Sequence, residues 1–321
     1  MEIDNKKSWR LKMKKRVSII GAGNVGATLA QLLAFNNIAD IILYDIIEGI
    51  PQGKALDIFE ACPLWNSSSY VTGSNDINAL EDSDIVVITA GLARKPGMSR
   101  DDLLIKNAEI IEKVSAEIKT LCPQSIVIVI TNPMDAMAHV AWNTTGFPKN
   151  RVMGMGGTLD ATRFCSFTAL QLNISPADIN SIVLGGHGDQ MVPMPRFTTV
   201  KGVPITELLS EETIDSLIQR TRNGGAEIVN MLKTGSAYYA PASAAYLMVK
   251  AVILDEKAVH AACCYLEGQY EINGLFVGVP AVIGAMGIER IIELNLNETE
   301  RKDFEHSVNA VKSLIKKLNI L

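Results

Sequence analysis

His187 is the residue in this chain best suited to acid–base chemistry. It stands between glycines in Leu184-Gly-Gly-His-Gly-Asp-Gln-Met191, just after a short apolar run that predicts a strand. Glycine leaves room around the side chain, and an imidazole with a pKa of about 6.5 can give and take a proton at neutral pH. The other histidines, His139, His260 and His306, fall in helical or strand patterns where packing or solvent exposure is expected.

A carboxylate and a guanidinium lie three residues apart in Leu159-Asp-Ala-Thr-Arg-Phe164. If this segment is helical, Asp160 and Arg163 share one face. The aspartate could then orient a histidine, while the planar arginine fork binds a ligand carboxylate through two hydrogen bonds. The alternative is an ordinary surface ion pair, and the two residues alone do not decide between these interpretations.

A glycine pattern near the N-terminus predicts a dinucleotide site. Three glycines follow the spacing G-x-G-x-x-G between an apolar run at 16–20 and an apolar helix through Phe35. Such a loop turns tightly, lets a pyrophosphate approach the backbone and presents helix N–H groups to it. The residues concerned are Gly21, Ala22, Gly23, Asn24, Val25 and Gly26.

Asp45 ends the next predicted strand, where a carboxylate accepts hydrogen bonds from ribose hydroxyls and repels a 2′-phosphate. The pattern therefore predicts NAD rather than NADP. A structural turn followed by a capping aspartate is the alternative.

Two further segments follow predicted strands, where doubly wound sheets bind ligands. The loop Gly91–Asp102 carries Arg94, Lys95 and Arg100 and suggests an anion-binding lid, with a solvated basic loop as the alternative. Asn132, in Ile130-Thr-Asn-Pro133, could hold a substrate hydroxyl or the nicotinamide, or could cap the helix that begins at the proline.

These residues need a scaffold, and the apolar pattern predicts one. Short apolar runs at 16–20, 41–44, 71–73, 85–89 and 126–130 alternate with helical stretches that include 52–61, 101–121 and 134–142. This alternation is typical of an α/β fold with a doubly wound parallel sheet of the Rossmann type.

The pattern changes near residue 151 and predicts a second, α+β domain for substrate and catalysis. Helices are expected at 159–172, 211–232 and 242–253, and strands at 182–184, 258–267 and 276–283. Antiparallel strands around a Lys201-Gly202 turn are expected at 192–203. A last helix has Asn297 as N-cap and Glu300 three residues on. The expected divisions are 14–150 for NAD, 151–321 for substrate, and 1–13 as a flexible tail.

Bulk properties exclude several classes of protein. The 321 residues carry a net charge of -5, which gives no general attraction to nucleic acid or anionic membranes. No apolar run approaches the ~20 residues that span a bilayer. Five cysteines without a CxxC motif favour reduced thiols in a cytoplasmic protein, and no His/Cys cluster predicts a metal site.

Several segments taken together resemble one family. They are GAGNVG, DIIEGIPQGKALDI, TAGLARKPGMSRDDL, ITNPMD, LDATRF, GGHGDQMVP and TGSAYYAPA. In this order they resemble the bacterial malate dehydrogenases of the lactate-dehydrogenase-like type, from about Lys15 to the C-terminus. The resemblance implies reversible NAD-dependent oxidation of (S)-malate to oxaloacetate.

The resemblance also implies roles for individual residues. His187 would be the general acid/base and Asp160 its orienting partner, while Arg163 would bind the C1 carboxylate and Arg100 would polarise the carbonyl. Arg94 would pair with the second carboxylate, since the matching place in lactate-specific relatives holds a neutral glutamine. The nicotinamide side would be lined by Asn107, Ile130, Thr131 and Asn132.

Three alternatives differ from this interpretation. Another 2-hydroxy acid dehydrogenase, such as lactate dehydrogenase, would share the chemistry, but Arg94 argues against it. An NAD-dependent glycosidase would need a metal site, and a non-catalytic NAD sensor would have no use for His187, Asp160 and the arginines together.

The resemblance further implies a homo-oligomer, either a tetramer built from dimers or a dimer.

Overall fold

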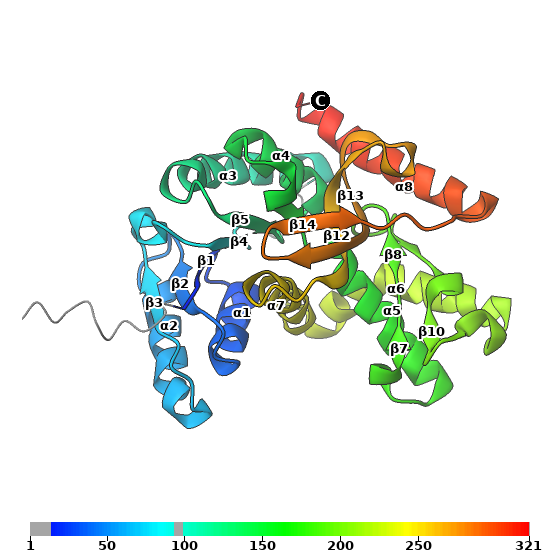
Figure 1. The fold of residues 1–321 in the computed structure, drawn as a ribbon, viewed down its shortest axis with the longest axis horizontal. Coiled ribbons are helices and arrows are strands. Elements are labelled where there is room, and N and C mark those ends of the chain that lie inside the picture. Colours follow the sequence, from blue (N-terminus) through cyan, green and yellow to red (C-terminus); the bar gives the residue numbers. More distant parts are fainter. Residues whose placement is uncertain (1–13, 93–98, 321) are drawn as a thin grey trace, which may run out of the picture.

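One mixed sheet runs through the molecule and carries the elements that position the site (Figure 1). The computed structural model describes residues 14–92 and 99–320. Within these residues nine strands follow the order β14-β13-β12-β6-β5-β4-β1-β2-β3. The predicted α/β fold class is confirmed.

The parallel half of the sheet has the strand order of a dinucleotide-binding fold, in which β1 lies between β2 and β4. Because β1, β4 and β5 are covered on both faces, their residues are apolar almost without interruption. The strands are β1 (Arg16–Ile20), β2 (Asp40–Tyr44), β3 (Val71–Ser74), β4 (Ile85–Ile88), β5 (Ile126–Val129) and β6 (Val152–Gly154).

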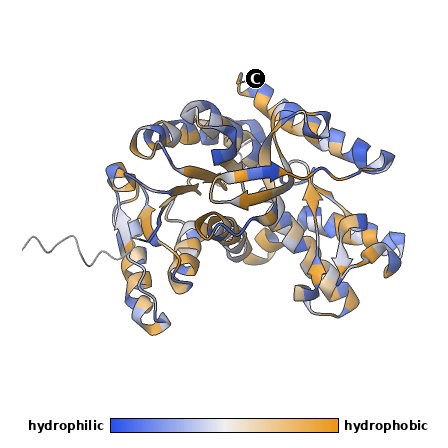
Figure 2. Cartoon of the chain, in the orientation of Figure 1, coloured by the Kyte–Doolittle hydropathy of each residue, from blue (hydrophilic) through white to orange (hydrophobic). Residues whose placement is uncertain are grey.

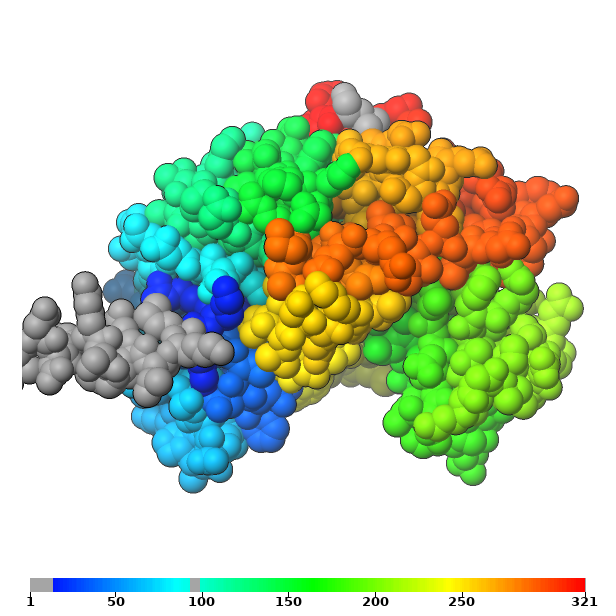
Figure 3. Space-filling model, in the orientation of Figure 1, coloured from blue at the N-terminus to red at the C-terminus, as the bar shows by residue number. Residues whose placement is uncertain are grey.

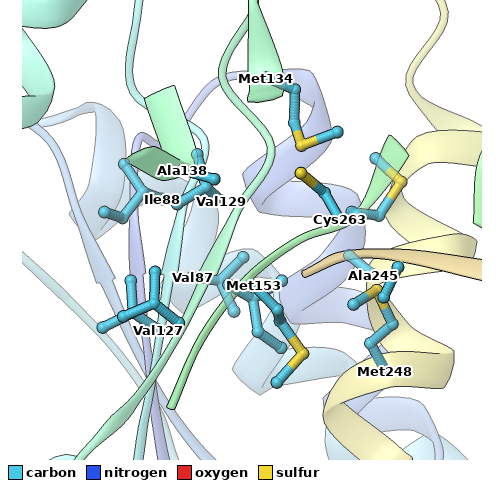
Figure 4. Close-up of a cluster of buried hydrophobic side chains, with 14 of the residues drawn as sticks. Val87, Ile88, Val127, Val129, Met134, Ala138, Met153, Ala245, Met248 and Cys263 are labelled. Atoms are coloured by element: carbon cyan, nitrogen blue, oxygen red, sulfur yellow. The ribbon is translucent and has the colours of Figure 1, made fainter. Parts of the chain in front are cut away.

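Helices cover both faces of this sheet (Figure 1). On one face α3 (Arg100–Leu121) packs against α4 (Met134–Thr145), and on the other α1 (Asn24–Phe35) packs against α7 (Tyr239–Ile253) and α2 (Ile50–Ala61). Figure 4 shows the core that results, where Val87 and Val127 of the strands meet Met153 and, from α7, Met248. A helix from the C-terminal half thus completes the packing of the N-terminal sheet.

The sheet continues into the C-terminal half through antiparallel strands. They are β12 (Ala258–Glu267), β13 (Asn273–Gly284) and β14 (Gly287–Ile291). The join is narrow, because β12 meets β6 at the single register pair Cys263↔Gly154. The division near residue 150 stays a prediction.

A separate lobe holds the segment that carries His187. It contains α5 (Gly156–Leu172), α6 (Glu211–Leu232) and five strands of two residues: β7 (Ile179–Asn180), β8 (Val183–Leu184), β9 (Val192–Pro193), β10 (Thr199–Val200) and β11 (Val203–Pro204). In the space-filling view this green lobe stands apart from the blue and cyan N-terminal half, with α7 in yellow between them (Figure 3).

The C-terminal helix α8 (Glu298–Lys317) lies along the outside with alternating polar and apolar residues (Figure 2). Its predicted capping box is confirmed: Asn297 Oδ1 accepts from Glu300 N at 2.9 Å, and Glu300 Oε2 accepts from Asn297 N at 2.9 Å. One apolar face of α8 is buried at Phe304, Val308, Val311 and Ile315.

Most predicted elements occur within a few residues of their expected bounds, but some predictions differ from the structure. Helix α5 begins at Gly156, three residues before the expected start at Leu159. In the 192–203 region the predicted antiparallel pair around Lys201 and Gly202 is confirmed as β10 and β11, but β9 pairs with β8 instead. Strands β6, β7 and β14 were not predicted, because they are short or interrupted by glycine and charged residues.

Two bulk expectations can be examined in the described part of the chain. All five cysteines are free, and four are buried. No described helix combines the length and apolar character needed to cross a membrane.

The capping box predicts a measurable stability difference. Asn297→Ala removes the acceptor for Glu300 N and should lower the free energy of unfolding by about 1 kcal/mol. The matched control is Asn309→Ala, which makes the same change at an exposed position inside α8 and should be neutral or slightly stabilising. Urea unfolding at one protein concentration compares them, and equal values for the two variants would contradict the capping role.

Candidate active site

A groove lies at the carboxyl ends of the parallel strands. Residues that follow β4, β5 and β6 line it, and helices α5 and α6 close its far side. Its lining includes Thr89, Asn132, Arg163 and His187. A second hollow, around Asp45, shares Thr89, Gly91 and Leu92 with it, so the glycine loop and His187 open onto adjoining spaces.

His187 and Asp160 form the centre of the site. The imidazole Nδ1 lies 2.8 Å from Asp160 Oδ2, and the side chains are 12% and 1% exposed. An ionised carboxylate only accepts hydrogen bonds, so it fixes the proton on Nδ1 and leaves Nε2 for a ligand. The predicted partnership between these residues is therefore present in the structure.

The surroundings of His187 determine the direction of its pKa shift. Burial alone would lower the pKa, but the charge and hydrogen bond of Asp160, with the charge of Asp135, outweigh burial and raise it. Arg163 opposes them. The imidazole therefore keeps its proton to a higher pH than a free histidine does.

Arg163 reaches the groove from the same helix as Asp160. Its Nη1 lies 3.4 Å from Asp160 Oδ1, and its side chain is only 14% exposed. This long contact leaves most of the guanidinium's donors available to a ligand carboxylate. The i,i+3 pair is thus a buried part of the pocket, which excludes the alternative of a solvated ion pair.

The glycine loop has the shape that a pyrophosphate requires. Gly21 has a φ of +110°, and a Cβ on Gly26 would lie 1.9 Å from Gly21 O, so both positions need glycine. A Cβ on Gly23 would meet nothing within 4 Å, and no side chain caps the first turn of α1. Open space and free helix N–H groups therefore coincide at Gly23.

Asp45 is hydrogen-bonded to this loop. Its Oδ2 accepts from Ala22 N at 2.7 Å and its Oδ1 from Ile47 N at 3.0 Å. Each oxygen has two lone pairs, so the carboxylate can still accept from ribose hydroxyls. Lys54 Nζ donates to Ala22 O at 2.7 Å, a support that sequence reasoning missed.

The segment after β5 forms one wall of the groove. Ile130, Thr131 and Asn132 line the groove beside His187. Asn107 lies behind them: it is 1% exposed, and its amide donates to Asn132 O at 2.6 Å while its oxygen accepts from Leu92 N at 2.8 Å. Asn107 therefore acts on the groove through the main chain.

Asn132 does not cap α4, which corrects the alternative considered above. The helix begins at Met134 with Pro133 as its N-cap, and the Asn132–Pro133 peptide is cis. A proline ring disfavours helical geometry in the residue before it, so the helix starts beyond the proline. Within residues 14–92 and 99–320, the Asn132 side chain forms no hydrogen bond, which suits a ligand-binding role.

The basic loop is described only in part. Arg100 begins α3, with its side chain 76% exposed and its Nη2 2.9 Å from Asp189 Oδ2. Asp189 lies two residues after His187 and also lines the groove. Arg94 and Lys95 lie outside the described residues, so the predicted anion-binding lid stays a prediction.

Other groove residues gave no signal in the sequence. Arg222, Asn223 and Ala226 reach the groove from α6, and Met191 and Met155 supply apolar surface. Around Asp45, the space is lined by Tyr44, Ile46 and Ile47, the last two of them exposed. The α6 residues were not predicted, because they lie in a long amphipathic helix without a local motif.

The remaining histidines are where the sequence placed them, in packed or exposed positions. His139 is buried against Trp142 and Phe276, and burial lowers its pKa. His260 is half-buried and His306 is exposed. Among the described residues, no group of three or more His, Cys, Asp or Glu side chains could hold a metal ion.

Two family models match the chain. The model for the lactate/malate dehydrogenase NAD-binding domain matches residues 15–154, and the model for the α/β C-terminal domain of the same enzymes matches residues 157–319. The chain belongs to the lactate/malate dehydrogenase family. The predicted resemblance and the predicted NAD-binding domain are confirmed.

Relatives in this family match almost the whole chain. The malate dehydrogenase of Thermomicrobium roseum is 52% identical over 309 residues, which is 96% of this chain and 100% of the relative. That of Chlorobium phaeobacteroides is 52% identical over 95% of this chain and 99% of the relative.

Solved structures of both activities share the fold. The malate dehydrogenase of Cryptosporidium parvum has a TM-score of 0.93 at 44% identity and covers 96% of this chain and 100% of its own. The lactate dehydrogenase of the same organism, with lactic acid and NAD bound, has a TM-score of 0.92 at 40% identity and covers 95% and 98%. The fold alone therefore does not separate the two substrates.

The charges around His187 predict pKa shifts of opposite sign in two variants. Asp160→Asn removes the anion and should lower the pKa of His187, whereas Arg163→Gln removes an opposing cation and should raise it. An NMR titration of labelled histidine measures both, with His187→Asn identifying the resonance among the four histidines. Shifts of the same sign would contradict this account of the site.

Proposed function

We propose that His187, Asp160 and Arg163 carry out the chemistry of an NAD-dependent malate dehydrogenase in this chain. The relatives that share about half of the sequence over nearly its whole length bear that name. The chain catalyses the reversible oxidation of malate to oxaloacetate. The observation that supports the assignment of residues is the buried His187–Asp160 pair beside Arg163 in one groove.

The residues around the glycine loop fit NAD. The open space at Gly23 and the uncapped turn of α1 suit a pyrophosphate, and Asp45 suits an unphosphorylated ribose. We propose that Gly21–Gly26 and Asp45 hold the adenosine end and that Ile130–Asn132 face the nicotinamide. The chemistry that NAD supplies when bound is acceptance of the hydride from C2 of malate and its return to oxaloacetate.

Arg163 would bind the C1 carboxylate of the substrate. A guanidinium can donate two parallel hydrogen bonds to a carboxylate, which fixes the orientation of C2 as well as the position of the acid. Because Arg163 and Asp160 project from one helix, the bound C2 oxygen would lie toward the free Nε2 of His187. Asn132 would add a hydrogen bond from the opposite wall.

His187 would move the proton. During oxidation, Nε2 accepts the hydroxyl proton of malate, and the adjacent Asp160 stabilises the imidazolium that forms. During reduction, Nε2 returns the proton to the carbonyl oxygen. Since the pKa of His187 is raised, the protonated form that reduction needs persists to higher pH.

The two loop arginines would supply the remaining charge. Arg100 would stabilise the negative charge that develops on the C2 oxygen, and to do so it must leave its exposed ion pair with Asp189. Such a surface pair contributes at most about 1 kcal/mol, so a substrate anion can compete for the arginine. Arg94 would pair with the second carboxylate of malate.

Lactate dehydrogenase is the second candidate, because its solved structures match this chain nearly as well. The assay that separates the two activities is NADH oxidation at 340 nm with oxaloacetate or pyruvate, each repeated with NADPH. We expect rapid turnover with oxaloacetate and NADH only. A preference for pyruvate would favour the second candidate, and turnover with neither substrate would favour a non-catalytic NAD-binding protein.

Replacing His187 tests the proton-transfer role. His187→Asn should reduce kcat by about 10²- to 10⁴-fold, because a positioned acid/base contributes that much, while NADH affinity stays unchanged. The control His306→Asn alters an exposed histidine on α8 and should leave kcat unchanged. Near-normal turnover by the His187 variant would refute the assignment.

Replacing Arg94 tests substrate choice. Pyruvate would leave the Arg94 charge unpaired in a closed site, at a cost of about 2–5 kcal/mol. That cost corresponds to roughly 30- to 5,000-fold discrimination. Arg94→Gln should therefore strongly lower the ratio of kcat/KM for oxaloacetate to kcat/KM for pyruvate. An unchanged ratio would show that other residues determine substrate specificity.

We further propose that the chain forms a homo-oligomer, a tetramer built from dimers or a dimer. Large apolar side chains stand exposed on and beside α1 and α2, including Phe35, Leu56, Phe59 and Tyr70. Exposed apolar surface of this kind marks protein contacts. Light scattering distinguishes monomer, dimer and tetramer by mass.

We propose a cytoplasmic location, because the cysteines are free thiols. Five free thiols, four of them buried, suit a reducing compartment.

A further inference from the structure

Three successive main-chain N–H groups lead to the catalytic imidazole, and each donates to a different element. Gly185 N donates to Gly278 O of β13 at 2.9 Å. Gly186 N donates to Ser307 Oγ of α8 at 2.9 Å, and His187 N donates to Asp135 Oδ2 of α4 at 2.8 Å. The His187 backbone is thus held from three directions.

The glycines before His187 allow this contact with α8. A Cβ on Gly185 would lie 2.3 Å from Ser307 Oγ, and a Cβ on Gly186 would lie 2.6 Å from Val311 Cγ2. Gly185 also has a φ of +85°. Any larger residue would push the segment away from Ser307, so the space that glycine leaves is used by the C-terminal helix.

The burial of Ser307 is explained by its hydrogen bond with Gly186. It is fully buried on the apolar face of α8, where a hydroxyl is costly unless it forms a hydrogen bond. Its Oγ meets that requirement through Gly186 N, 121 residues away in the chain.

Asp135 is the more unusual of the two side chains. It is 4% exposed, and its Oδ1 has no hydrogen-bond partner among the described residues. Burial raises the pKa of Asp135, and burial together with the Asp135 charge raises the pKa of the neighbouring Cys263 thiol well above its ordinary value. The charged or titratable groups around the imidazole are therefore Asp160, Asp135 and Arg163, with Cys263 behind Asp135.

We propose that Asp135 and Ser307 are positioning residues for His187. Their side chains hold the His187 and Gly186 amides, and thereby set where Nε2 stands relative to the substrate held by Arg163. When ionised, Asp135 also adds to the effect of Asp160 in raising the pKa of His187. This inference rests on the proposed acid/base role of His187.

Two variants separate the hydrogen bond from the charge of Asp135. Asp135→Asn keeps an oxygen that can accept from His187 N but removes the charge, whereas Asp135→Ala removes both. Ser307→Ala removes only the acceptor for Gly186 N. Matched controls are Asp215→Asn and Ser313→Ala, which make the same changes at exposed positions on α6 and α8.

The measurements are kcat and KM for oxaloacetate reduction, the Kd of NADH, and the pKa of His187 by NMR. Ser307→Ala and Asp135→Ala should lower kcat by about 10- to 100-fold, because a small displacement of a catalytic group costs that much, with the Kd of NADH unchanged. Asp135→Asn should retain more kcat than Asp135→Ala while lowering the pKa of His187. Both controls should behave as wild type.

The inference is overturned if folded Ser307→Ala and Asp135→Asn match wild type in kcat and in the pKa of His187. Circular dichroism confirms folding, and if Asp135→Ala does not fold, Ser307→Ala and Asp135→Asn decide the matter. Failure of the proposed function would be seen differently, as absent oxaloacetate reduction by wild type or normal turnover by His187→Asn.

Discussion

The site depends on a buried carboxylate that must have a partner. Asp160 is 1% exposed, and removing an ionised carboxylate from water is costly unless hydrogen bonds and opposite charge compensate. His187 and Arg163 are the groups that compensate it, and both therefore stand where Asp160 requires. The same contact directs the imidazole proton to Nδ1 and leaves Nε2 open to the groove.

The continuous sheet brings this centre to the cofactor half. Residues after β4, β5 and β6 form one wall of the groove, while α5 and α6 form the other. Since the strands are parallel, their carboxyl ends meet at one edge, and loops from distant positions along the chain converge there. The antiparallel strands belong to the same sheet because β12 pairs with β6 at Cys263↔Gly154.

The sequence predicted the parallel half of the fold well, because its strands are buried on both faces and read as uninterrupted apolar runs such as 85–88 and 126–129. The capping box at Asn297 was predicted for a similar reason, since it is a local pattern. Strand β6 was missed because it has only three residues and one of its partners, β12, lies far along the chain. Strand β14 pairs with the neighbouring β13 and was missed because charged residues interrupt its apolar pattern.

The site shows the same division between local and distant signals. His187, with its flanking glycines, and the i,i+3 pair of Asp160 and Arg163 are local patterns that indicate chemistry. Asp135, Ser307 and Lys54 are polar residues in ordinary helical patterns, and only tertiary packing brings them to the loops they hold. Their contacts span 52, 121 and 32 residues, respectively.

The position of Ser307 has a consequence for the order in which the protein becomes competent during synthesis. Chains emerge from the ribosome N-terminus first, and the glycine loop, Asp45 and the strands up to β5 are made in the first 129 residues. The segment that carries His187 is not fully held until α8, the last helix, has been made and has packed against it. A nascent chain thus acquires the elements that suit cofactor binding well before it can hold His187 in place.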